Sequence, residues 1–276
     1  PLVIVLSFLL VKWPRARAAR HPLLGAVVAA LLLGGFLGCQ AWRAQQRDLA
    51  VLLRERTFFG VHRVSRTRDE WHLLEHSTTL HGIQSRHTDE KGVYWGRQPT
   101  TYYHDSGPIG DVFRVFHRLP QTQRVAVVGL GAGTLAAYAG RGAAFDFYEI
   151  DPAVARIAGD RRYFSYLDDA RARGAVVRTI LGDGRLRLAQ AANAGYGAIV
   201  LDAFTSDVVP VHLLTREAIA VYLTRLVPGG VMAFHVSNRF FDLLPVLAAD
   251  ARDLGLAARV RDDSRITPAQ AGEQKR

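Results

Sequence analysis

The chain has 276 residues, of which 49% are hydrophobic and 22% charged, a balance that excludes a disordered protein and indicates a globular one. Its net charge of +10 comes mainly from arginines scattered along the chain. No basic and aromatic motif of an RNA- or DNA-binding module accompanies them, so we expect no nucleic-acid partner. The single cysteine, Cys39, excludes a disulfide framework and a thiolate metal site, and we expect no bound metal.

Two apolar stretches occupy the beginning of the chain. Residues 1–11 are predicted to be the end of one hydrophobic helix, and residues 22–42, which carry no charge, are predicted to be a transmembrane helix. About 20 apolar residues suffice to cross a bilayer as a helix. A signal peptide and a buried helix are the alternatives, but a signal peptide would not follow another apolar run and a basic loop. We therefore expect a membrane protein in contact with lipid, with residues 43–57 as a basic linker.

A small β domain is predicted for residues 58–104. Its short segments with alternating hydrophobic residues, which favour an antiparallel sheet, are 59–66, 70–76 and 78–84. Three histidines, His72, His76 and His81, fall in these segments. A histidine pair four residues apart can bind metal on a helix, but on strands the two side chains do not converge in that way. We interpret these histidines as structural or surface residues.

A Rossmann-like domain is predicted for residues 105–276, beginning with a helix over 107–119. Five short, apolar and β-branched segments then alternate with helical stretches: 124–129, 145–150, 176–181, 197–202 and 231–236. This alternation predicts an α/β fold, with a parallel sheet of the S-adenosylmethionine-dependent methyltransferase kind and helices on both faces. Ligands of such sheets bind at the carboxyl ends of the strands, near the point where the strand order reverses.

The ends of the first two of these strands carry a nucleotide-binding pattern. Gly129, Gly131 and Gly133 follow the first strand, and glycines there allow a tight turn and a close approach of the backbone to a ligand. Thr134 stands where a dinucleotide fingerprint has its third glycine, which favours an adenosyl-sulfonium cofactor over NAD. Glu149 ends the second strand, and a carboxylate there can accept hydrogen bonds from both ribose hydroxyls.

The next two strands end in further carboxylates. Asp183, followed by Gly184, can accept a hydrogen bond from an adenine amino group. By itself this segment could be an ordinary turn. Because the glycine loop and Glu149 also stand at the carboxyl ends of strands, we favour a binding role for it. Asp202 faces the reacting end of the cofactor, and Asp207 adds an acidic group suited to a cationic substrate such as an amine. The alternative interpretation of Asp207 is that it caps the N-terminus of a helix. For Thr215 we adopt the N-cap interpretation.

These residues resemble the spermidine synthase (polyamine aminopropyltransferase) family, and more narrowly its bacterial branch in which the domain follows membrane helices. The resemblance runs from about residue 59 to 260. The motifs that carry it are His81-Gly82-Ile83-Gln84, Tyr102-Tyr103-His104-Asp105, the loop from Gly129 to Gly133, Glu149-Ile150-Asp151, Gly182-Asp183-Gly184, Asp202 to Asp207, and His235 to Arg239.

The resemblance implies an enzyme of polyamine biosynthesis. It would transfer an aminopropyl group from decarboxylated S-adenosylmethionine to putrescine or a longer polyamine and release methylthioadenosine. It implies roles for individual residues: Asp202 would be catalytic and accept the proton of the amine. The implied cofactor site consists of Gln84, Gly129, Gly131, Gly133, Glu149, Asp151, Asp183 and Gly184, and the implied amine site of Tyr103, His104, Asp105 and Asp207. Because this cofactor is made in the cytoplasm, we expect the catalytic domain to lie there. The sequence is also compatible with a homodimer.

The sequence departs from the family in three places. Ala132 replaces an aspartate that normally helps to hold the aminopropyl ammonium; Asp202 and Asp207 are five residues apart where the family has three; and after residues 255–263 the chain turns polar where the family continues with two closing strands. Two alternatives follow. One is an S-adenosylmethionine-dependent methyltransferase, and the other is a non-catalytic domain that binds a polyamine or nucleoside.

Overall fold

The computed structural model describes residues 32–38, 50–77, 79–118, 123–204, 210–237 and 241–263. The chain divides into two units, Pro1–Asp48 and Leu49–Arg276. In the first unit residues 32–38 are helical, and the rest of the predicted membrane segments 1–11 and 22–42 lies outside the described residues, as does Asp207. Among the described residues, no helix combines the length and apolar character that crossing a bilayer requires.

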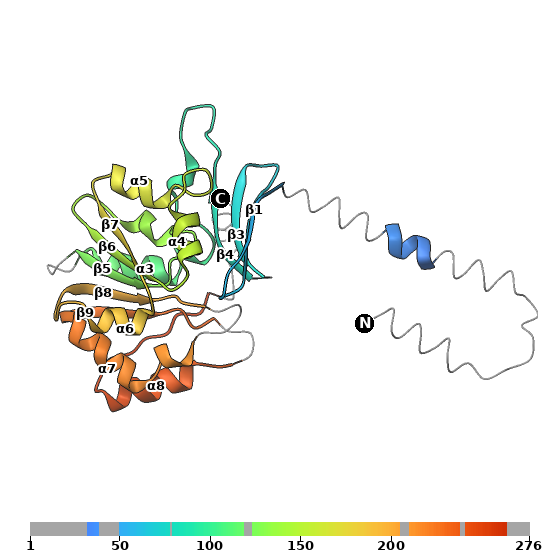
Figure 1. The fold of residues 1–276 in the computed structure, drawn as a ribbon. Helices are drawn as coiled ribbons and strands as arrows, with labels where there is room; N and C mark the ends of the chain where they lie inside the picture. Colours follow the sequence, from blue (N-terminus) through green and yellow to red (C-terminus); the bar gives the residue numbers. More distant parts are fainter. Residues whose placement is uncertain are drawn as a thin grey trace, which may run out of the picture. The chain divides into compact units, whose positions relative to one another are not determined.

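The second unit begins with a four-stranded antiparallel sheet in the order β1-β2-β3-β4 (Figure 1). Its strands are β1 (Ala50–Arg56), β2 (Val61–Arg66), β3 (Trp71–His76) and β4 (Thr79–Ser85). The sheet predicted from the alternating segments is thereby confirmed. The prediction of a linker was wrong over residues 50–56, which form β1. Arg54 and Arg56 are exposed on this strand, while Leu52 and Leu53 are partly buried against the core beneath the small sheet, so its basic composition concealed a strand.

The chain then passes through η1 (Trp95–Arg97), η2 (Thr101–Tyr103) and α3 (Pro108–Phe116) into a five-stranded sheet. Its strands are β5 (Arg124–Val128), β6 (Ala144–Glu149), β7 (Val176–Leu181), β8 (Tyr196–Leu201) and β9 (Leu226–Phe234). All neighbouring strands are parallel, and the order is β7-β6-β5-β8-β9. The predicted parallel sheet is therefore confirmed. Because the chain moves outward from β5 in one direction and then crosses to β8, the strand order reverses between β5 and β8.

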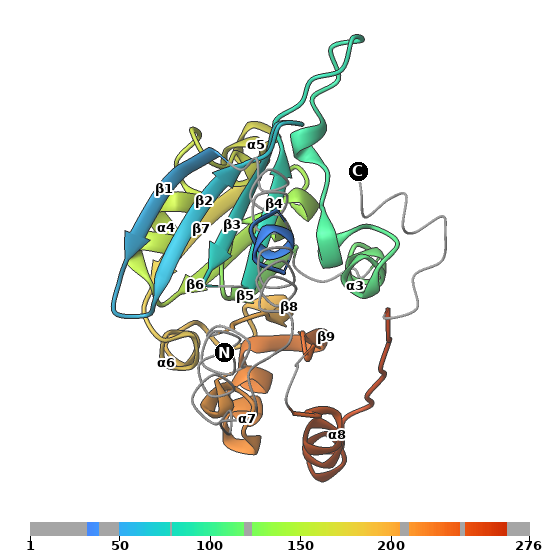
Figure 2. The same cartoon turned by 90° about the vertical axis from the view of Figure 1, so that its right-hand side faces the viewer.

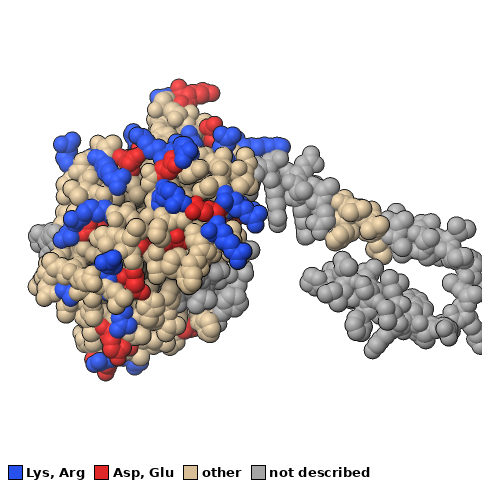
Figure 3. All heavy atoms as spheres, viewed as in Figure 1, with Lys and Arg blue, Asp and Glu red and all other residues tan. Residues whose placement is uncertain are grey.

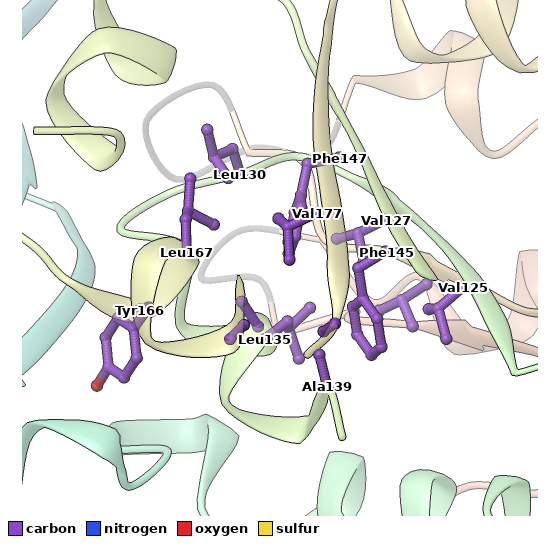
Figure 4. Close-up of a cluster of buried hydrophobic side chains, with 14 of the residues drawn as sticks. Val125, Val127, Leu130, Leu135, Ala139, Phe145, Phe147, Tyr166, Leu167 and Val177 are labelled. Atoms are coloured by element: carbon purple, nitrogen blue, oxygen red, sulfur yellow. The ribbon is translucent and has the colours of Figure 1, made fainter. Parts of the chain in front are cut away.

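Helices cover both faces of this sheet, as predicted (Figures 1 and 2). One face packs against α3, η3 (Thr134–Tyr138), α4 (Pro152–Ala158) and α5 (Tyr166–Ala172). The other packs against α6 (Gly184–Ala189), η4 (Val211–Leu213) and α7 (Arg216–Arg225), and α8 (Leu244–Asp253) follows β9. Alternation along β5 supplies both cores: Val127 lies in the first (Figure 4) and Val128 in the second.

The small sheet packs directly on the glycine loop that follows β5. The small sheet, the glycine loop and the α4 region share a buried cluster made of Val64, Leu74, Ala132, Ile157 and Phe164. In this cluster Ala132 is 1% exposed. A β-carbon on Gly82 of β4 would come within 2.5 Å of the Ala132 β-carbon, which shows how closely the strand and the loop approach.

Two of the three histidines singled out in the sequence are buried parts of this packing. His72 Nδ1 lies 2.7 Å from the Tyr163 carbonyl oxygen, and the His76 ring lies 5.0 Å from that of His62. Burial lowers the pKa of both His72 and His76. Across the part of the chain that the structure describes, no group of three His, Cys, Asp or Glu side chains is arranged to hold a metal ion.

The basic side chains are dispersed over the surface. On the face drawn in Figure 3, Lys and Arg side chains are interspersed with Asp and Glu. Several arginines are paired, among them Arg63 with Glu75 at 2.9 Å and Arg171 with Asp168 at 2.9 Å. Pairing of this kind reduces the positive electrostatic potential that would attract the phosphates of a nucleic acid.

A buried carboxylate network supports the parallel sheet and gives a first prediction. Asp146 of β6 is 0% exposed and accepts hydrogen bonds from Arg178 Nε at 2.6 Å, from Arg124 at 2.8 Å and from the Tyr196 hydroxyl at 2.8 Å. Burial alone raises the pKa of Asp146, but its hydrogen bonds outweigh burial and hold the pKa below the ordinary value. A lowered pKa stabilises the fold above the ordinary carboxyl pKa of about 3.9, and this contribution is lost as the pH falls further.

We expect Asp146→Asn to lower the free energy of unfolding by about 3 kcal/mol at pH 7, because it leaves the guanidinium groups without their anion. The difference in the free energy of unfolding between the variant and the wild type should shrink as the pH falls below about 4. Urea denaturation across this pH range measures it, with the exposed Asp69→Asn as the matched control. A difference that is the same at every pH would contradict the assigned role of the Asp146 charge.

Candidate functional site

The glycine loop lies between the end of β8 and the small sheet. Gly129 and Gly131 have φ values of 98° and 53°, a conformation that L side chains rarely adopt. A β-carbon on Gly129 would lie 2.3 Å from the Asp202 carbonyl oxygen, and one on Gly131 would lie 2.6 Å from the His81 carbonyl oxygen. Both positions therefore need glycine. The loop then enters η3 at Gly133, so a 3-10 helix follows it.

Glu149 stands at the end of β6 with its carboxylate against this loop. Its Oε2 accepts the Leu130 N–H at 3.0 Å and its Oε1 accepts the Asp151 N–H at 2.9 Å. Burial raises the pKa of Glu149, and the two backbone donors oppose that rise. The structure therefore places the predicted ribose-binding carboxylate beside the loop that the sequence predicted for the same ligand.

Asp151 points the other way, toward the small sheet. Its Oδ2 lies 2.6 Å from Thr57 Oγ1 and 2.7 Å from His62 Nε2, and its Oδ1 accepts the Ala153 N–H at 2.8 Å as the N-cap of α4. Burial raises the pKa of Asp151, but these hydrogen bonds prevail and hold it below the ordinary value. Asp151 thus ties β2 to α4, and its predicted contact with the cofactor stays a prediction.

Asp183 is at the start of α6, after β7. Its Oδ1 accepts the Leu186 N–H at 2.9 Å, and its Oδ2 lies 2.9 Å from His212 Nε2. A β-carbon on Gly184 would lie 2.4 Å from Val128 Cγ1, so glycine lets α6 approach β5 closely. An adenine amino group at Asp183 would therefore compete with His212 for the carboxylate.

Gln84 is fully buried, and its amide joins three elements. Its Nε2 donates to the Gly96 carbonyl at 2.7 Å and to Ser165 Oγ at 2.9 Å, and its Oε1 accepts the Ser165 N–H at 2.8 Å. These bonds connect β4 with η1 and with the N-terminus of α5. The contact of Gln84 with a cofactor, implied by the family resemblance, stays a prediction.

Asp202 follows β8 at the reversal of the strand order, opposite the glycine loop. Its Oδ2 accepts the Tyr103 hydroxyl at 2.5 Å, and its Oδ1 lies 2.7 Å from His235 Nδ1. Tyr102 in turn donates to the Tyr103 hydroxyl at 2.9 Å. Burial, with the charge of Asp202 as a further cause, raises the pKa of both phenols, so both remain protonated donors.

The other residues predicted for the amine site are distributed differently. His104 has Nε2 at 2.9 Å from Asp263 and Nδ1 at 2.9 Å from Ser106, and Asp105 is exposed with its carbonyl accepting from Arg114. Of the amine-site residues that the structure describes, it brings Tyr103 into contact with Asp202.

Two members of the Asp202 cluster were absent from the predicted site. Tyr102 and His235 both lie in motifs that carried the family resemblance, but no role was assigned to them. His235 directly follows β9, at the same carboxyl edge of the sheet as Asp202. Its position was therefore the signal that could have identified it.

A test of the ribose-binding role follows from the position of Glu149. We expect Glu149→Gln to weaken binding of methylthioadenosine by about 10- to 100-fold, because a charge-assisted hydrogen bond is worth roughly 1.5–3 kcal/mol. Isothermal titration calorimetry measures it. Glu217→Gln, on the exposed first turn of α7, is the matched control. Unchanged affinity in Glu149→Gln would remove Glu149 from the nucleoside site.

The fold and this arrangement define a Rossmann-like α/β domain with a glycine loop and carboxylates at the carboxyl edge of its sheet, preceded by a small antiparallel sheet. No family model matches the chain. Over 126 residues, 44% of this chain, the sequence is 34% identical to the polyamine aminopropyltransferase of Vibrio vulnificus (strain CMCP6). The chain spans 39% of that relative's length. This similarity supports the predicted resemblance at the level of the family.

Solved structures with a similar backbone include spermidine synthase from Thermotoga maritima, with a TM-score of 0.49 and 16% identity over 74% of this chain and 63% of that one. A probable spermidine synthase from Corynebacterium glutamicum ATCC 13032 has a TM-score of 0.48 and 17% identity over 67% of this chain and 62% of that one. The chain thus spans less than two thirds of either protein.

Proposed function

We propose that this chain is an aminopropyltransferase that moves an aminopropyl group from decarboxylated S-adenosylmethionine to an amine. The observation that carries the proposal is the position of Asp202. Its carboxylate is 6% exposed at the reversal of the strand order, accepts the Tyr103 hydroxyl, and belongs to a residue whose backbone adjoins Gly129 of the glycine loop. The sequence identity with an aminopropyltransferase supports the same reaction class.

The chemistry requires a neutral nucleophile and a positioned electrophile. An alkyl amine has a pKa near ~10.4 in water, so at neutral pH it must lose a proton before it can attack. A base at the Asp202 site must therefore take that proton, and the carbon beside the sulfonium must be held in line for attack. In this proposal Glu149 holds the ribose, Asp183 holds the adenine, and much of the acceleration comes from fixing the two reactants in line.

A methyltransferase is the second candidate, and Ala132 favours it. The side chain at this position is 1% exposed and packs among apolar residues of the small sheet, so it offers no carboxylate to an aminopropyl ammonium. S-Adenosylmethionine would then be the cofactor and S-adenosylhomocysteine the product.

The location of the enzyme is a separate part of the proposal. We propose that residues 22–42 cross a membrane and that the catalytic unit lies on the cytoplasmic side, where its cofactor is made. The acceptor is putrescine or a longer polyamine.

Nucleoside products distinguish the two candidates. The full chain is incubated with decarboxylated S-adenosylmethionine, or with S-adenosylmethionine, against a panel of diamines and polyamines. We expect methylthioadenosine to form with at least one amine. Release of S-adenosylhomocysteine instead would establish the methyltransferase, and release of neither product would contradict both.

A further inference from the structure

His235 lies beside Asp202 at the end of the sheet. Its backbone N–H donates to the Leu201 carbonyl at 2.9 Å, which continues the pairing of β8 with β9 by one residue. Its ring lies between Tyr102, at a centroid distance of 4.6 Å, and Phe204, at 4.8 Å. The side chain of His235 is 26% exposed, whereas that of Asp202 is 6% exposed. A ligand therefore has better access to the imidazole than to the carboxylate.

The hydrogen bonds of Asp202 determine the tautomer of this ring. Both of its oxygens already have partners, Tyr103 at Oδ2 and His235 at Oδ1. An ionised carboxylate only accepts hydrogen bonds, so Nδ1 of a neutral His235 carries the proton and Nε2 carries the lone pair. Among the described residues, the titratable groups that face the ring are Asp202, Tyr102 and, through Asp202, Tyr103.

We propose that His235 is the base of this site and that it accepts the proton of the acceptor nitrogen at Nε2, while Asp202 orients the ring and stabilises the imidazolium. The proposal rests on the aminopropyltransferase function. Nε2 takes one proton from the ammonium form of the acceptor, and the freed lone pair forms a bond to the carbon beside the sulfonium. The carbon–sulfur bond breaks with its electron pair going to sulfur, and the lengthened amine leaves as an ammonium with its two remaining N–H protons. The Nδ1–H to Asp202 hydrogen bond persists throughout, as in other carboxylate–histidine pairs.

The substitution His235→Gln separates a base from a positioning residue. A glutamine amide still donates a hydrogen bond to Asp202 but has no basic nitrogen. We expect kcat to fall by about 10²–10⁴-fold and the acid limb of the pH–kcat profile to disappear, with KM for the nucleoside substrate within about twofold of wild type. His117→Gln, at an exposed histidine after α3, is the matched control and should behave as wild type.

A second measurement does not require turnover. In the full chain labelled with ¹⁵N-histidine, the resonances lost in His235→Gln identify His235, and their shifts report which ring nitrogen is protonated. We expect the neutral form of the ring to carry its proton on Nδ1, and a loss of this preference in Asp202→Asn.

The outcomes separate the two claims. A neutral ring with its proton on Nε2 in the wild type, or a wild-type kcat profile in His235→Gln, would overturn the role of His235 alone. A wild-type chain that releases no methylthioadenosine with any amine would contradict the proposed function, and with it the amine as proton donor.

Discussion

The substitution Asp202→Asn is expected to slow product formation by about 10³–10⁴-fold while leaving the affinity for methylthioadenosine within about twofold of wild type. Asparagine keeps the size of the side chain but removes the carboxylate that stabilises the His235 imidazolium once the proton of the amine has been taken. It can also present its N–H groups to His235, and so reverse the tautomer that the carboxylate imposes. Because Asp202 is not among the residues assigned to the nucleoside, binding should persist.

Single-turnover rates and calorimetric affinities measure the two halves of this prediction. Asp242→Asn is the control: Asp242 is exposed and caps the Leu244 N–H, a task that asparagine also performs. If Asp202→Asn kept a rate within tenfold of wild type, Asp202 would not belong to the catalytic machinery. If it lost methylthioadenosine binding as well, the separation between the nucleoside and the reacting end would be wrong.

The substitution Ala132→Asp, which introduces the carboxylate usual in the family, is expected to destabilise this chain by about 3 kcal/mol or more. Ala132 is packed among Val64, Leu74 and Phe164, where an ionised group loses its hydration and gains no cation. Its β-carbon is also opposed by the backbone of Gly82. We expect no gain in the use of decarboxylated S-adenosylmethionine over S-adenosylmethionine.

Urea denaturation and the ratio of kcat/KM for the two nucleosides test this pair of effects. The exposed Ala192→Asp serves as the control for adding the same charge at the surface. A stable Ala132→Asp variant with a clear preference for the decarboxylated nucleoside would contradict the buried environment described for this position. It would also show that the loop can open toward the ligand.

Most of the fold follows from hydrophobic periodicity in the sequence, and the exceptions have physical causes. The central strands β5, β6 and β8 are buried on both faces or nearly so, which gives the continuous apolar runs from which they were predicted. β1 was missed because its exposed residues are arginines. β9 begins at Leu226, earlier than predicted, because an edge strand tolerates the turn-forming sequence Pro228-Gly229-Gly230.

The site was predictable where the position in the topology determines the role. Glu149, Asp183 and Asp202 were predicted to lie together because the carboxyl ends of parallel strands meet at one edge, and the structure places them at that edge. Their roles in binding and catalysis stay predictions. The partners of a side chain depend on segments far apart in the chain: Asp151 binds His62, and Gln84 binds Ser165. The partnership of Asp202 with His235 likewise became visible only in the structure.

The fate of the aminopropyl carbons tests the central claim most directly. The full chain is given decarboxylated S-adenosylmethionine labelled with ¹³C in its aminopropyl group, together with the best amine of the panel, and the products are followed by mass spectrometry. We expect the label in an amine that is longer by one aminopropyl unit, in amounts equal to the methylthioadenosine released. Methylthioadenosine without labelled amine, or no reaction while the nucleoside binds, would contradict aminopropyl transfer by this chain.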